Sequence, residues 1–166
     1  MNIKHLIAGG LLVCAGSALA EEAPIEGTVE AKCVITTETD GVYGNPVPYK
    51  LSTTAADGGV LPIIRYDVIS ADYYKASISH PDEFTSSPGL DDTVTWTGST
   101  SVHEVSDAGM SAYDTDKIEF NNTTEVDLSI AGSTWFKVSS VAEYGYQKSF
   151  PAGAYTAVVV AECIAL

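Results

Sequence analysis

Cysteines are the residues of this chain best able to form a covalent bond, and they occur at positions 14, 33 and 163. Cys14 lies in an N-terminal segment that we expect to be removed, so Cys33 and Cys163 remain as one possible pair in an oxidising compartment. We expect a disulfide between them; the alternative is two buried free thiols. The closed loop would span 130 positions (163 minus 33), for which the chain-entropy model gives about 4 to 5 kcal/mol of stabilisation.

Metal chemistry would need clustered ligands, and the sequence does not cluster them. His80 and His103 each lack a second histidine or a cysteine at zinc-ligand spacing. Asp114 and Asp116 could attract calcium weakly, but the regular loop with its glycine at the sixth position and its closing glutamate is missing. We therefore predict no metal site and no cofactor, and we expect these acidic side chains to be solvated.

Enzymatic chemistry is not indicated either. Serines are numerous, but none lies in the G-x-S-x-G turn that exposes a hydrolase nucleophile. Paired carboxylates keep one enzymatic alternative open, because a β-sandwich with 22 acidic residues can bring two of them together. We expect that the protein is not an enzyme, so its function should depend on binding or assembly.

The first 20 residues have the pattern of a secretory signal peptide. Lys4 precedes a short apolar run, and small residues at positions 18 and 20 fit an A-x-A cleavage site. We place the cleavage between Ala20 and Glu21. The apolar run is shorter than the roughly 20 residues that a membrane anchor requires. A lipoprotein site at Cys14 is less favoured, because Val13 before it is bulkier than the small residue expected there.

Removal of the signal would leave 146 residues (166 minus 20), which is enough for one domain with one core. This part carries all 22 acidic residues and seven basic ones (8 minus Lys4), so its formal charge is -15. Such a surface repels phosphate backbones and anionic lipids. We therefore expect no nucleic-acid partner and no membrane insertion.

The composition and turn signals indicate an all-β chain. Val, Ile, Thr and Tyr are frequent, Gly and Pro punctuate the sequence, and no long stretch keeps an apolar period of 3.6 residues. The clearest alternation places Val126, Leu128 and Ile130 on one face of a strand. The number and spacing of strands favour an immunoglobulin-like sandwich over a barrel. The predicted strands are 25–37, 47–52, 61–70, 73–79, 93–97, 117–121, 125–130, 134–141 and 154–165.

Two further predictions concern the middle of the chain. Residues 97–116 are polar and rich in Ser and Asp, so we expect a surface excursion with a short helical turn. Trp96 and Trp135 are expected in the core, because tryptophan is heavily buried on average.

The two ends of the mature chain have matching patterns. After the cleavage site, small or apolar residues alternate with Glu26, Thr28, Glu30 and Lys32, as in a strand laid over a hydrophobic groove. The ordinary first strand of a sandwich fits the pattern equally well. The last strand runs to Leu166, and we expect its outer edge to lack a partner in the same chain. The alternating sets are Ala23, Ile25, Gly27, Val29, Ala31 and Cys33 at one end, and Tyr155, Ala157, Val159, Ala161, Cys163 and Ala165 at the other.

These ends resemble those of chaperone-usher pilins: Gly153-Ala-Tyr155 leads a valine-rich terminal strand, and Thr28-Val-Glu-Ala31 follows an A-x-A signal. The N-terminal stretch is most similar to the colonisation-factor (alpha-type, class 5) pilins. The resemblance implies an all-β, incomplete immunoglobulin-like sandwich that lacks its final strand and carries an N-terminal donor strand. Residues 1–20 would be the signal peptide, 21–31 the donor-strand extension and 32–166 the pilin domain.

The resemblance also implies a function: a structural subunit of a surface pilus (fimbria) with a role in adhesion or biofilm formation. Such subunits are exported to the periplasm, bound by a periplasmic chaperone, passed to an outer-membrane usher and joined head to tail to other copies of themselves by donor-strand exchange. The donor positions would be Ile25, Gly27, Val29 and Ala31. The acceptor groove and chaperone contact would be formed by Tyr155, Ala157, Val159, Ala161, Ala165 and Leu166.

One feature departs from the pattern of this family. The alpha-type pilins lack cysteines, and other pilins usually join two early strands by their disulfide, whereas Cys33 and Cys163 would join an early strand to the last. A rival interpretation is a secreted immunoglobulin-like binding module that recognises sugar or protein through its loops and completes its own sandwich with its first strand. Exposed aromatic residues on one loop would favour that rival, and the candidates are Trp96, Trp135 and residues 144–146.

Overall fold

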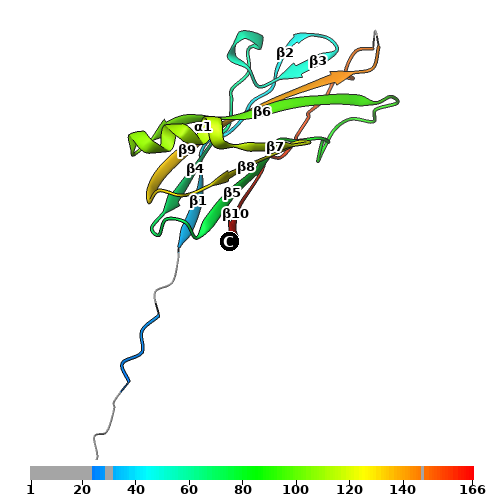
Figure 1. Cartoon of the computed structure of the whole chain (residues 1–166). Coiled ribbons are helices and arrows are strands. Elements are labelled where there is room, and N and C mark those ends of the chain that lie inside the picture. The colour runs from blue at the N-terminus through cyan, green and yellow to red at the C-terminus, as the bar shows by residue number, and fades with distance from the viewer. Residues whose placement is uncertain (1–23, 29–31, 147) are drawn as a thin grey trace, which may run out of the picture.

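The computed structural model describes residues 24–28, 32–146 and 148–166, and it is an all-β protein with two antiparallel sheets (Figure 1). The predicted signal peptide 1–20 and its cleavage site at Ala20 and Glu21 lie outside the described residues, as do the predicted donor positions Val29 and Ala31. Within the part of the chain that is described, no helix is long and apolar enough to cross a membrane.

The larger sheet is built around the long strand β9 (Gly132–Tyr144). One edge of β9 pairs with β4 (Ile63–Val68) and, further along, with β3 (Lys50–Ser52), while β6 (Val94–Val105) pairs along the opposite edge. The strand β1 (Cys33–Thr39) pairs with β4 and ends the sheet on that side. The short β2 (Gly44–Val47) pairs with β3.

The smaller sheet has the order β10, β5, β8, β7. Its strands are β5 (Tyr74–Ser79), β7 (Ile118–Phe120), β8 (Thr123–Asp127) and β10 (Val160–Ala165). Three short helical turns complete the described elements: η1 (Ala55–Asp57), η2 (Ala108–Ala112) and α1 (Tyr113–Asp116). The C-terminus and the start of β1 lie at the same end of the molecule (Figure 1).

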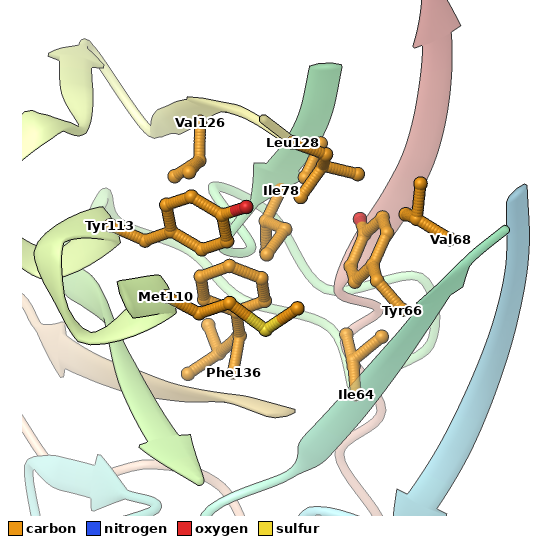
Figure 2. Packing of buried hydrophobic residues seen from close by; sticks show 11 residues of the cluster. Ile64, Tyr66, Val68, Ile78, Met110, Tyr113, Val126, Leu128 and Phe136 are labelled. Carbon is orange, nitrogen blue, oxygen red and sulfur yellow. The ribbon is translucent and has the colours of Figure 1, made fainter. Parts of the chain in front are cut away.

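The hydrophobic core lies between the two sheets (Figure 2). Ile64, Tyr66 and Val68 alternate along β4 and are buried, because successive side chains of a strand point to opposite faces. They meet Ile78 of β5 in one cluster, and full burial of each aliphatic side chain contributes about 1.5 to 3 kcal/mol. The helical turns η2 and α1 add buried side chains to this cluster, namely Met110 and Tyr113.

Several strand boundaries differ from the sequence-based prediction. The first strand begins at Cys33 rather than Ile25, since residues 24–28 have no strand pairing. Residues 154–159 belong to no strand, apart from one isolated bridge between Thr156 and Ser86, so the last strand is shorter than predicted.

The predicted surface excursion 97–116 was wrong in its first half. Residues up to Val105 continue β6 and pair with β9, and only the second half contains helical turns. The placement of tryptophan in the core was also wrong, because Trp96 and Trp135 are both half-buried outside the core cluster. Trp135 lies on the outer face of β9, where the Arg65 guanidinium is 5.9 Å from its ring centroid.

Candidate functional site: a cleft between two end strands

Two strands at the same side of the molecule each have a partner on one edge only. Among the described residues, β1 pairs with β4 alone and β10 pairs with β5 alone, so each ends its own sheet. The Cys33–Cys163 disulfide joins them, and their Cα atoms are 6.3 Å apart. The predicted disulfide is therefore present, and it links the two sheets.

A cleft of about 600 Å³ opens beyond the disulfide, between the far end of β1 and the segment that leads into β10. One wall comes from the end of β1 and the turn after it, and the opposite wall from residues 153–159. We call it the end-strand cleft. It is lined by Thr37, Asp40, Gly41, Val42, Tyr43, Leu51, Thr53, Pro62, Ile64, Pro81, Ser140, Gly153, Tyr155, Thr156, Ala157, Val158 and Val159.

The lining of the end-strand cleft is mostly apolar, and several of its polar side chains are hydrogen-bonded within the domain. The hydroxyl groups of Tyr43 and Ser140 lie 2.8 Å apart and form a hydrogen bond. Burial raises the pKa of Tyr43, and the hydrogen bond to Ser140 opposes this shift only in part. Asp40 is the single Asp, Glu, Lys or Arg residue in the lining. The cleft therefore suits an apolar strand better than a charged ligand.

The wall formed by residues 153–159 is held by an aromatic cluster. Phe84 lies at its centre, with ring centroids 5.1 Å from Tyr155 and 4.7 Å from Trp96. Phe150 packs 5.2 Å from Tyr155 and stacks on Tyr144 at the same distance. Such pairs contribute about 0.5 to 1.5 kcal/mol each beyond burial. The cluster fixes this wall although the wall has no partner strand.

Backbone hydrogen bonds reinforce the same wall. Thr156 donates its N–H to the carbonyl of Ser86 over 2.8 Å and accepts from Thr85 over 2.8 Å. The Tyr155 hydroxyl donates to the Pro151 carbonyl over 2.7 Å. The role of Phe84 and Phe150 is not predictable from the sequence, where each is only an aromatic residue in a Pro-containing loop.

The predicted acceptor residues fall into two groups. Tyr155, Ala157 and Val159 line the end-strand cleft, and their half-buried side chains alternate with exposed neighbours. Ala161 packs against the core cluster. The remaining two lie past the disulfide, outside the cleft lining, and are exposed: Ala165 and Leu166.

The predicted donor positions that are described do not pair with the domain. Ile25 has 99% of its surface exposed, and Gly27 has no neighbour that a methyl group added to it would meet within 4 Å. Residues 24–28 extend away from the end where β1 begins (Figure 1). Their apolar side chains are therefore available to a surface outside this chain.

A second, shallower pocket of about 320 Å³ lies beside Trp96. Part of its polar lining is engaged, since the Asn122 amide donates to the His80 carbonyl over 2.9 Å. Among the described residues, no group of three His, Cys, Asp or Glu side chains could hold a metal ion. No protein-family model matches this sequence, and no curated protein or solved structure matches it.

Proposed function

We propose that this protein is a structural subunit of a surface pilus, in which a strand from a second copy fills the end-strand cleft. The observation that carries the proposal is the pair of end strands, β1 and β10, with an apolar cleft between them. An edge strand left open is a template for pairing with another chain. Strand addition at such an edge is an established mode of protein association.

The order of the strands supports an incomplete immunoglobulin-like sandwich. In a constant-type sandwich, one sheet contains strands A, B, E and D, and the other contains C, F and G. In this protein the larger sheet has the same order, with β1 as strand A, β4 as B, β9 as E and β6 as D. In the smaller sheet, β5 corresponds to strand C and β10 to strand F. Strand G would pair with the free edge of β10, and no described strand occupies that place. The hairpin of β7 and β8 is an addition beside β5.

The segment that would supply this strand is the N-terminal one, residues 21–31. Its alternating small and apolar residues suit a cleft whose lining is apolar, while its acidic residues would face solvent. Burial of Ile25 and Val29 contributes roughly 1.5 to 3 kcal/mol each. Ordering ten residues costs roughly 10 to 20 kcal/mol. A durable fibre therefore depends on about ten further backbone hydrogen bonds and on slow dissociation.

The proposal includes the route of assembly. A periplasmic chaperone covers the cleft until an outer-membrane usher brings two subunits together, because an apolar cleft beside an open strand edge is an aggregation risk in the free protein. The subunit is then exported from the periplasm to the cell surface. The disulfide supports an oxidising compartment, in which such bonds form and persist.

Substitutions in the N-terminal segment test the proposal. Glutamate in place of Ile25 and Val29 should abolish polymer formation by the mature chain, because both charges would enter the apolar cleft. Thr28→Glu is the matched control, since it adds the same side chain on the face predicted to meet solvent. Polymer length is measured by electron microscopy and size-exclusion chromatography. Normal fibres from a chain that lacks residues 21–31 would disprove the proposal.

The rival function, a binding module that completes its own sandwich, has less support. Residues 24–28 do not pair with the domain, and Ile25 is exposed. Of its candidate aromatic residues, Trp96 and Tyr144 are packed in the aromatic cluster. A stable monomer that shows no exchange with an added peptide of residues 21–31 would favour this rival.

A further inference from the structure

We propose that Lys32 of one copy forms an ion pair with Asp40 at the mouth of the end-strand cleft of the next copy, and that this pair sets the register of the inserted segment. The inference rests on the proposed function and adds a contact between two named residues. The end-strand cleft differs in shape at its two ends.

The end-strand cleft is closed at one end and open at the other. At the disulfide, the Cα atoms of β1 and β10 are only 6.3 Å apart, whereas packed sheets need about 10 Å for two layers of side chains. At the other end, the turn after β1 at Asp40 and residues 153–159 both line the cleft, without a covalent bond between them. A strand with a whole domain attached must leave by the open end, which we call the mouth.

The direction of the inserted segment follows from its attachment. The domain continues from its C-terminal side, at Lys32 and Cys33, so that side lies at the mouth. The segment then runs antiparallel to β10, as do all the paired strands of both sheets to their neighbours. The antiparallel arrangement is also slightly more stable per residue than the parallel one.

The lengths of the two parts agree. The cleft lining ends at Val159, and the disulfide at Cys163 lies four residues further along. Eight residue steps (163 minus 155), about 26 Å in an extended strand, therefore separate Tyr155 at the mouth from the disulfide. Eight steps also separate Ala23 from Ala31 (31 minus 23). If Ala23 of the inserted segment lies beside the disulfide of the next copy, Ala31 is the last residue of the segment that lies within the cleft. Lys32 is then at the mouth, where Asp40 lies.

Charge supports the same register. Asp40 is the one Asp, Glu, Lys or Arg residue that lines the cleft, and Lys32 is the one basic residue between positions 21 and 32. Of the seven basic residues after position 20, five form ion pairs with described residues, and only Lys32 and Lys137 do not. Lys32 is exposed, so its ammonium group is accessible to another copy.

Charge reversal in the full mature chain tests the ion pair. Lys32→Glu and Asp40→Lys should each slow polymerisation about two- to fivefold at low salt, the range expected for an exposed pair at the rim of an interface. The double variant restores the attraction with its charges exchanged, so its rate should return to that of the parent chain. Added salt should reduce these differences. The readout is the initial rate of polymer growth by light scattering.

Two controls separate this contact from general electrostatics. Lys137→Glu makes the charge change of Lys32→Glu at the other basic residue that forms no ion pair with a described residue. Glu104→Lys makes the charge change of Asp40→Lys at an exposed acid on β6. Both should polymerise like the parent chain. Equal slowing by Lys137→Glu and Lys32→Glu, or no recovery in the double variant, would overturn the ion pair and leave the proposed function intact. A parent chain that forms no polymer would overturn both.

Discussion

Cys33 opens β1 and Cys163 lies within β10, and the disulfide between them joins the end strands of the two sheets across 130 positions of sequence. No backbone hydrogen bond is found between these two strands in the described part of the chain. The disulfide therefore joins, without strand pairing, the side of the sandwich where β1 and β10 end their sheets.

Loss of this bond should lower stability strongly. Replacement of both cysteines by serine should reduce the free energy of unfolding by about 4 to 5 kcal/mol, because the closed loop restricts the unfolded chain. Denaturant titration with and without reductant measures the difference. The double variant should be insensitive to reductant, and a parent chain whose midpoint does not move on reduction would contradict the prediction.

The hydroxyl group of Tyr66 connects β10 to the core. Tyr66 is fully buried, and its hydroxyl donates to the carbonyl of Ser77 over 3.2 Å and lies 3.4 Å from that of Glu162 in β10. Burial raises the pKa of Tyr66 well above its usual value, so the hydroxyl stays protonated as a donor. The contributions of the ring and of the hydroxyl group to the free energy of unfolding can therefore be measured separately.

Tyr66→Phe should cost about 0.5 to 1.5 kcal/mol, since it removes a hydrogen bond and keeps the ring. Tyr66→Ala should cost about 3 to 5 kcal/mol, because it also leaves a cavity in the core. Denaturant unfolding measures both, and hydrogen exchange should show faster exchange in β10 of the phenylalanine variant. Equal stability of the two variants would show that the ring contributes nothing.

Part of this architecture could be predicted because it depends on local alternation. Val126 and Leu128 are buried while Asp127 between them is exposed, as the pattern of the strand indicates. The pairing of Cys33 with Cys163 could be predicted because only two cysteines remain after the expected signal peptide and an oxidising compartment favours a disulfide between them. The alternation of half-buried and exposed residues from Tyr155 to Cys163 is also present in the sequence.

Other features depend on neighbours that a sequence does not reveal. Residues 97–105 are polar, yet they form a strand because β9 offers a long edge to pair with, and strand propensity depends on such context. The same reason shortens the last strand: residues 154–159 alternate like a strand, but no described strand lies beside them to pair with. Alternation of apolar and polar residues predicts which side chains share one face of a strand, but it does not show whether a neighbouring strand is present to pair with it.

Acid should weaken the contact between Asp57 of η1 and Lys50 of β3. The Lys50 ammonium lies 2.8 Å from the Asp57 carboxylate, and this bond, helped by Ser52 and Thr54, lowers the pKa of Asp57 from 3.8 to about 2. A folded pKa below the unfolded value means that the stabilisation is complete above pH 4 and is lost as the pH falls towards 2.

Asp57→Asn should therefore lower the melting temperature most above pH 4, and the difference from the parent chain should shrink as the pH approaches 2. Melting followed by circular dichroism over this range measures it. Glu104→Gln, at an exposed carboxylate that forms no ion pair with a described residue, is the control and should give a small difference at every pH. A constant effect of Asp57→Asn down to pH 2 would contradict the assigned ion pair.

The aromatic cluster predicts a link between packing and the end-strand cleft. Phe84 contacts Tyr155 on the cleft wall and Trp96 on β6, and it is half-buried. Phe84→Ala should cost about 1 to 3 kcal/mol, less than the 3 to 5 kcal/mol typical of a fully buried phenylalanine. The larger effect should be local, because residues 153–159 have no partner strand to hold them once the ring is lost.

Hydrogen exchange distinguishes the local effect from general destabilisation. In Phe84→Ala, amides of residues 153–159 should exchange faster while those of β4 and β9 keep their protection, because local opening needs less free energy than global unfolding. Phe136→Ala is the matched control, since it removes the same side chain from the main core and should expose all strands together. If the proposed function holds, Phe84→Ala should also polymerise more slowly, because a mobile wall must be ordered before a strand can be inserted. Unchanged exchange in residues 153–159 would show that the backbone bonds between Thr156 and Ser86 hold the wall without the ring.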